Sequence, residues 1–179
     1  MQSRTHAIAT GIFVLGLAMA GWAGGTTSTS TRHPPLTDAA SSPQELVDRF
    51  LHALEAKDPD GLHRLRVTES EFRDVILPGF VPAGEQPRTY PDSYTDFAWQ
   101  TLDTKSHYYE RYLLAQYGGR HYTVKDTKYA EGTGEYATYR TLKQLRLVLD
   151  ADGTEVRLGT GSIVAMGGQY KFASFVYDD

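Results

Sequence analysis

The chain has 179 residues, of which 40% are hydrophobic and 22% are charged, proportions typical of one globular domain rather than a disordered segment. Its formal net charge is −4 and it has no basic run, which argues against a nucleic-acid-binding or polybasic membrane-surface protein. Because no cysteine is present, disulfides, iron–sulfur clusters, thiol nucleophiles and thiolate-bound zinc are excluded.

The first recognisable element is an apolar run over residues 7–20, which follows Arg4 and contains no charged residue. It is shorter than the ~20 apolar residues that a membrane-spanning helix needs. A basic start, an apolar middle and small residues at the end predict a secretory signal peptide over residues 1–23, cleaved after Ala20 or Ala23. We therefore expect an exported protein, periplasmic or extracellular, with no membrane span after cleavage.

A stretch rich in Thr, Ser, Gly and Pro follows over residues 24–42 and predicts a flexible tether. Trp22 stands where a bacterial lipoprotein signal would carry its acylated cysteine, so the chain as written is not lipidated there. The sequence leaves open whether Trp22 replaces such a cysteine.

The folded domain is predicted to span residues 43–179 and to begin with a helix at Pro43, behind a capping box. Apolar residues then recur at helical spacing until Lys57 ends the helix. Asp58 and Thr68 each predict the cap of a further short helix, before Pro78 interrupts the pattern.

The longest predicted helix covers residues 93–117 and is followed by a Gly118-Gly119 stop signal. Its expected apolar stripe consists of Trp99, Leu102, Tyr109, Leu113 and Tyr117. The Pro-rich segment 78–92 before it is longer than most connections in compact domains, and is either a functional lid or a mobile insertion.

The remaining sequence alternates as strands do, with the turn signals Asp152-Gly153 and Gly167-Gly168 between apolar runs. Gly159 and Gly161 predict a bend where the sheet curves. Helices followed by strands indicate an α+β fold, with a curved, mainly antiparallel sheet of about four strands. The expected strands are 121–129, 135–149, 156–166 and 170–177.

This order of elements resembles the nuclear transport factor 2-like (SnoaL-like) superfamily, a cone-shaped α+β fold. The matching segments are the first helix over residues 46–54, the turn 58–62 and the closing strand 169–175. Three further segments, 68–73, 117–120 and 168–172, resemble uncharacterised exported bacterial members. The superfamily includes isomerases, dehydratases and epoxide hydrolases with a site inside the cone, and also binding and scaffold proteins. The resemblance therefore implies a fold without choosing a function.

Asp103, His107 and Arg111 are four residues apart and share one face of the long helix. Lining a cone, Asp103 would orient His107 as a general base. The apolar stripe lies beside this face, so a solvated ladder of ion pairs is the favoured interpretation. The other histidines of the domain, His52, His63 and His121, form no spacing motif, so we expect neither a metal site nor a cofactor.

Arg140 lies beside Tyr139 in an expected strand, and would bind an anionic ligand if it faced inward. A bulge would reverse its direction, so outward orientation is the alternative. Tyr108, Tyr109 and Tyr112 are interpreted as packing between helix and sheet, with a pocket wall as the alternative. The candidate pocket-lining residues are Trp99, His107, Tyr109, Tyr139 and Arg140.

The favoured function is an exported, non-catalytic domain that binds a small ligand or a partner. One alternative is an isomerase, dehydratase or hydrolase whose site lies in the cone, with a buried carboxylate or histidine as its ionisable group. The other alternative is a protein-interaction module, or a homodimer formed through the sheet.

Overall fold

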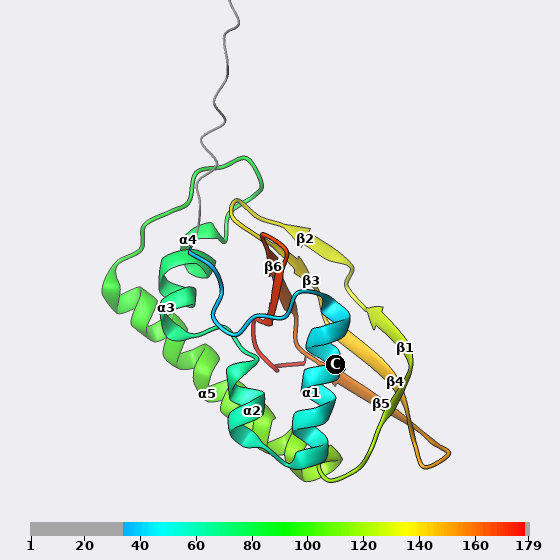
Figure 1. Ribbon diagram of the computed structural model, residues 1–179. Helices are drawn as coiled ribbons and strands as arrows, with labels where there is room; N and C mark the ends of the chain where they lie inside the picture. Colours follow the sequence, from blue (N-terminus) through cyan, green and yellow to red (C-terminus); the bar gives the residue numbers. More distant parts are fainter. Residues whose placement is uncertain (1–33, 178–179) are drawn as a thin grey trace, which may run out of the picture. The chain divides into compact units, whose positions relative to one another are not determined.

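A computed structural model describes residues 34–177, in which helices come first and strands follow (Figure 1). The α+β class expected from the sequence is confirmed, and the strands form two antiparallel sheets. The predicted signal peptide and the first part of the tether lie outside the described residues. Among the helices that are described, none combines the length and apolar character needed to cross a bilayer.

Helix α1, Pro43–Ala56, begins and ends as its sequence predicts. The Ser42 side chain accepts a hydrogen bond from the Glu45 amide, and Pro43 occupies the first turn, where no amide donor is needed. Lys57 takes the left-handed conformation that ends the helix, with φ at 53°. The apolar face of α1 packs into the core through Leu46, Val47, Phe50, Leu51, Ala53 and Leu54.

Three short segments follow: α2 (Pro59–Arg64), α3 (Glu69–Glu71) and α4 (Leu77–Gly79). Between α3 and α4 the chain widens into a π-helical turn, η1 (Phe72–Ile76), which periodicity did not predict. Pro78 offers a physical reason, because it lacks an amide donor and its ring would clash with the carbonyl four residues earlier. The wider turn closes on Leu77, whose amide donates to the Phe72 carbonyl.

Helix α5, Asp92–Tyr117, has the predicted length, and its predicted apolar stripe faces the core. Of the expected stripe only Leu113 is fully buried, and the other buried residues of α5 are Thr95, Ser106 and Glu110. The rest of the stripe is partly buried and packs against the two apolar clusters of the core, so α5 is held by apolar contacts together with buried polar side chains.

The two sheets are a three-stranded one in the order β1-β4-β5 and a four-stranded one in the order β2-β3-β6-β7. The sheet of about four strands that the sequence predicts is thus divided into more and shorter strands. Their bounds are β1 Thr123–Tyr129, β2 Thr133–Glu135, β3 Arg140–Leu142, β4 Leu145–Ala151, β5 Thr154–Thr160, β6 Ile163–Met166 and β7 Gln169–Phe172.

Two bends cause this division, because each long predicted strand breaks after a few residues. Between β3 and β4, Gln144 adopts a left-handed conformation with φ at 54°. Between β5 and β6, a Cβ at Gly161 would lie only 2.1 Å from the Ser174 carbonyl oxygen, so only glycine fits there. The predicted glycine bend is therefore present at Gly161.

Part of the expected tether belongs to the folded domain. Leu36 and Ala40 are 3% and 1% exposed, although both lie within residues 24–42. Ala40 pairs with Tyr170 through two backbone hydrogen bonds, of 3.0 and 2.9 Å, at the edge of β7. The sequence predicted a tether here because the stretch is mostly polar. Its few apolar residues are too sparse to show the periodicity of a helix or strand.

A buried ion pair ties this N-terminal segment to the sheet. The Lys171 ammonium lies 3.0 Å from Glu71 Oε2, and their side chains are 1% and 8% exposed. The same carboxylate accepts hydrogen bonds from the amides of Thr37 and Thr68, at 2.5 and 2.7 Å. Glu71 thereby completes the predicted capping box and also neutralises a cation that has no access to water.

Replacing Lys171 by Met should lower the free energy of unfolding by about 3–5 kcal/mol, because Glu71 would remain buried without its counter-ion. The double variant K171M/E71Q should recover part of that loss, since no uncompensated charge remains. Urea unfolding followed by circular dichroism measures both. A K171M midpoint equal to that of the native protein would show that the pair contributes nothing to stability.

Candidate functional site

The main candidate site is a groove between the Phe72–Leu77 region, the first half of α5 and the four-stranded sheet. It consists of two adjoining hollows of about 450 and 410 Å³ that share Phe72, Ser162 and Ala173. We call this the α5 groove. Its other lining residues are Ile76, Leu77, Phe80, Tyr94, Ala98, Thr101, Leu102, Lys105, Glu131, Tyr136, Tyr139, Thr141, Lys143, Gln144, Val164, Ser174 and Val176.

Aromatic rings form one wall of the α5 groove. Phe80 stacks on Tyr136 with ring centroids 5.0 Å apart, and Tyr136 stacks in turn on Tyr139 at 5.1 Å. At the mouth, Phe80 and Tyr94 are 58% and 49% exposed, which is unusual for large apolar side chains. The groove therefore offers a flat, largely apolar surface that opens to solvent.

Two buried polar groups in the α5 groove have no hydrogen-bond partner within the described residues: Thr141 Oγ1 and Gln144 Oε1. Thr141 pairs with Val164 across β3 and β6, so both side chains lie on the same face of the sheet, and both line the groove. Buried polar atoms normally find a partner, and leaving one without costs about 1–3 kcal/mol. Thr141 lines one of the two hollows of the groove and Gln144 lines the other.

The backbone of Gln144 is a second unusual feature of the groove, because it adopts the left-handed conformation. A non-glycine residue in the left-handed region is uncommon and carries strain, and such residues concentrate at functional sites. The backbone amide of Gln144 donates a hydrogen bond to Ser162 Oγ at 3.3 Å, which holds the bend beside the groove.

Tyr139, one of the residues predicted to line a pocket, does so. Its hydroxyl donates to the Ile76 carbonyl at 3.2 Å. Burial, reinforced by the neighbouring tyrosines, raises the pKa of Tyr139 above its usual value, so the ring stays a neutral phenol. Tyr139 therefore acts as a wall of the groove and not as a base.

Tyr109 lines a different hollow, of about 700 Å³, between the second half of α5 and strands β4 and β5. Its hydroxyl donates to the Tyr177 carbonyl at 2.9 Å. Tyr108 and Tyr112, both exposed, line the same hollow, so the pocket-wall alternative describes these two, whereas Tyr109 also packs against the core as expected.

The other predicted pocket residues lie apart. Trp99 packs behind the α5 groove, against Phe72, with ring centroids 5.5 Å apart. Arg140 is exposed beside a shallow hollow on the rim of the four-stranded sheet, so the outward orientation is the one observed. The five candidates thus lie in several places and do not form one site.

A cluster of charged side chains between α2 and α5 is the second candidate site. Arg66 is 1% exposed, and its Nη2 atom donates to Asp103 Oδ1 at 3.0 Å. Its Nε atom lies 2.6 Å from Glu110 Oε1, an ion pair without the alignment of a hydrogen bond. The interpretation of Asp103, His107 and Arg111 as a solvated ladder is therefore wrong for the first two, which contact this buried network, while Arg111 is exposed.

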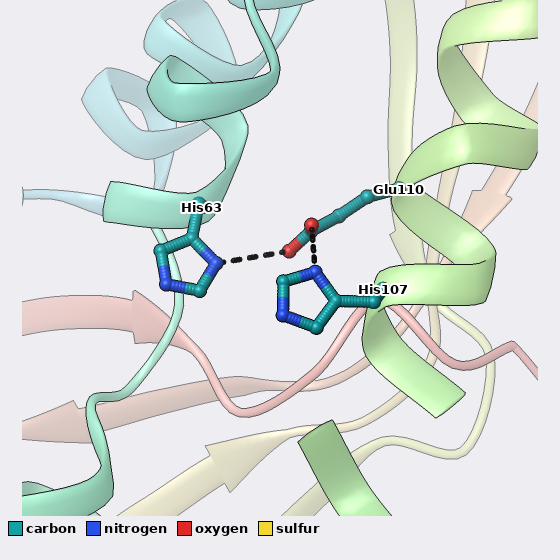
Figure 2. A group of neighbouring side chains, drawn as sticks. All are labelled: His63, His107 and Glu110. Carbon is teal, nitrogen blue, oxygen red and sulfur yellow. Dashed lines mark hydrogen bonds and ion pairs between the residues drawn. The ribbon is translucent and has the colours of Figure 1, made fainter. Parts of the chain in front are cut away.

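Two imidazoles complete this cluster (Figure 2). His107 Nδ1 lies 3.0 Å from Glu110 Oε2, and His63 Nδ1 lies 3.7 Å from Glu110 Oε1. The rings are nearly parallel, with centroids 5.2 Å apart. Sequence spacing missed His63, Arg66 and Glu110, because the first two precede Glu110 by more than 40 residues. The only sign of this cluster in the sequence is that His107 and Glu110 are three residues apart, which places them on one face of α5.

Comparison with known proteins assigns no family. No protein-family profile matches the chain, and no curated protein or solved structure is significantly similar to it. The function must therefore be argued from the two sites.

Replacing Arg66 by Met should destabilise the protein by about 3–5 kcal/mol, because the buried Glu110 carboxylate would lose its counter-ion. Arg73→Met is the matched control. Arg73 also pairs with two carboxylates, Glu69 and Asp96, but on the surface, and its loss should barely move the unfolding midpoint. Thermal unfolding of the two variants side by side tests this, and equal shifts would contradict it.

Proposed function

We propose that this protein is a non-catalytic domain that binds a small amphipathic molecule in the α5 groove. The single observation that carries the proposal is the pair of unpartnered buried groups, Thr141 Oγ1 and Gln144 Oε1, in a groove with aromatic walls. Sites of this kind combine a mostly apolar surface with a few placed polar groups that orient the ligand. The expected ligand has a flat apolar body and a polar group that reaches Thr141 or Gln144.

The ionisable groups of the groove support binding rather than catalysis. Among its described lining residues, Lys105 and Glu131 are exposed and Lys143 is half-buried, so no carboxylate or imidazole is enclosed there. An acid–base enzyme would need a positioned group whose pKa suits proton transfer at working pH, whereas Tyr139 is a phenol with a raised pKa. The isomerase, dehydratase or hydrolase alternative therefore has less support from this groove.

Export and a nuclear transport factor 2-like relationship belong to the same proposal. The helices precede two bent antiparallel sheets, and the α5 groove lies between α5 and the four-stranded sheet. This arrangement is consistent with a cone-like binding fold. The interaction-module alternative draws its support from the exposed rings of Phe80, Tyr94 and Phe97, near the mouth of the groove.

The proposal is tested by titrating the protein with anilinonaphthalene sulfonate, a fluorescent probe with a flat apolar body and one anionic group. Ala173 lies where the two hollows meet, so Ala173→Leu should fill the groove and weaken probe binding at least tenfold. The same substitution at Ala115, an exposed residue of α5 outside the groove, should leave binding unchanged. Equal binding by the two variants would rule out the α5 groove as the site.

The role of the unpartnered hydroxyl is tested by Thr141→Val. This change keeps the shape of the side chain, and losing one hydrogen bond to the probe's polar group should weaken binding about fivefold, equivalent to about 1 kcal/mol. Thr160→Val is the matched control, since Thr160 is also buried with an unpartnered hydroxyl but does not line the groove. A loss of binding in T160V equal to that in T141V would contradict the assigned contact.

A further inference from the structure

We propose that His63, His107 and Glu110 bind a divalent transition-metal ion of the Zn²⁺ class. This site is separate from the α5 groove, because none of the three residues lines it. Each offers one ligand atom, and these atoms all lie within 4.8 Å of one another. Figure 2 shows how the set is assembled, with His63 on α2 and the other two residues on α5.

The distances leave room for such an ion. Zinc–nitrogen and zinc–oxygen bonds of about 2.1 Å place the ligands of a tetrahedral site about 3.4 Å apart. His107 Nδ1 and Glu110 Oε2, at 3.0 Å, are already close to this spacing. The His63 side chain is 53% exposed, and its Nδ1 accepts a hydrogen bond from Arg66 Nη2 at 3.0 Å, so the ring would turn to present Nε2 to the ion. The fourth position would be taken by water.

The surrounding residues supply what a metal site requires beyond its ligands. Glu110 directs Oε1 to Arg66 and Oε2 to His107, so the guanidinium fixes the carboxylate without covering the oxygen that faces the histidine. Asp103 Oδ2 lies 3.5 Å from His107 Nε2, the nitrogen not used for the metal. A carboxylate behind a histidine ligand is the usual second contact at zinc sites, where it orients the ring and raises its basicity.

Charge and access are also favourable. The single guanidinium of Arg66 pairs with two carboxylates, those of Asp103 and Glu110. The His107 and His63 side chains are 44% and 53% exposed, which gives an ion a path from solvent. Two imidazoles and one carboxylate favour zinc-like ions over Ca²⁺ or Mg²⁺, which prefer oxygen ligands.

The test is calorimetric titration of the full-length, tag-free protein with ZnCl₂ after treatment with a chelator. His63→Ala and His107→Gln should each weaken Zn²⁺ binding at least tenfold, and each substitution changes a partly exposed side chain, so folding should be retained. His121→Ala is the matched control, because His121 also lies beside a carboxylate, Glu55, at 3.1 Å. The H121A substitution should leave the affinity for Zn²⁺ unchanged. Mg²⁺ should not compete with Zn²⁺ for the site.

A second measurement uses the fact that the ion would join α2 to α5. Ligand that binds only the folded state raises the unfolding temperature, so Zn²⁺ should stabilise the native protein and H121A but not H63A or H107Q. Co²⁺ in place of Zn²⁺ should give visible absorption that the same two variants lose. Native protein that shows no saturable Zn²⁺ binding, or H63A and H107Q that bind as tightly as native, would overturn the proposal.

Discussion

One buried cation, Arg66, ties α5 to the sheet. The chain on either side of this residue is fixed to β7, because the Val67 amide donates to the Phe172 carbonyl at 2.8 Å and the Phe172 amide donates to the Leu65 carbonyl at 2.9 Å. The guanidinium thus extends from a rigid sheet edge to the carboxylates of α5. A buried charge of this kind is tolerated only where it is neutralised nearby, so α5 must stay where Asp103 and Glu110 reach Arg66.

Both candidate sites lie beside α5. This helix packs its apolar stripe against the core and also buries three polar residues, and the α5 groove lies beside its first half. On the side of α5 that faces α2, the same ion pairs bring His107 and Glu110 next to His63.

The sequence predicts local structure well here and long-range contacts poorly. Ser42, Asp58 and Thr68 cap helices as expected, and Asp152-Gly153 and Gly167-Gly168 form turns with positive φ, because these signals act over only a few residues. The π-helical turn before Pro78 and the bend at Gln144 were not foreseen, since neither leaves a periodic signal in the sequence. Arg66 and Glu110 look like ordinary surface residues in the sequence, and their burial appears only when α2 and α5 are brought together. Of the five predicted pocket residues, Tyr139 lies in the α5 groove, whereas the rest are elsewhere or behind it.

We propose that Thr141 and Gln144 are kept without internal partners because a bound molecule satisfies them. The most direct measurement is a crystal structure of the protein grown with the fluorescent amphipathic probe. We expect electron density for the probe in the α5 groove, with its polar group or a bridging water within hydrogen-bond distance of Thr141 Oγ1 or Gln144 Oε1. A groove closed by its own side chains, with both atoms hydrogen-bonded inside the protein, would contradict it.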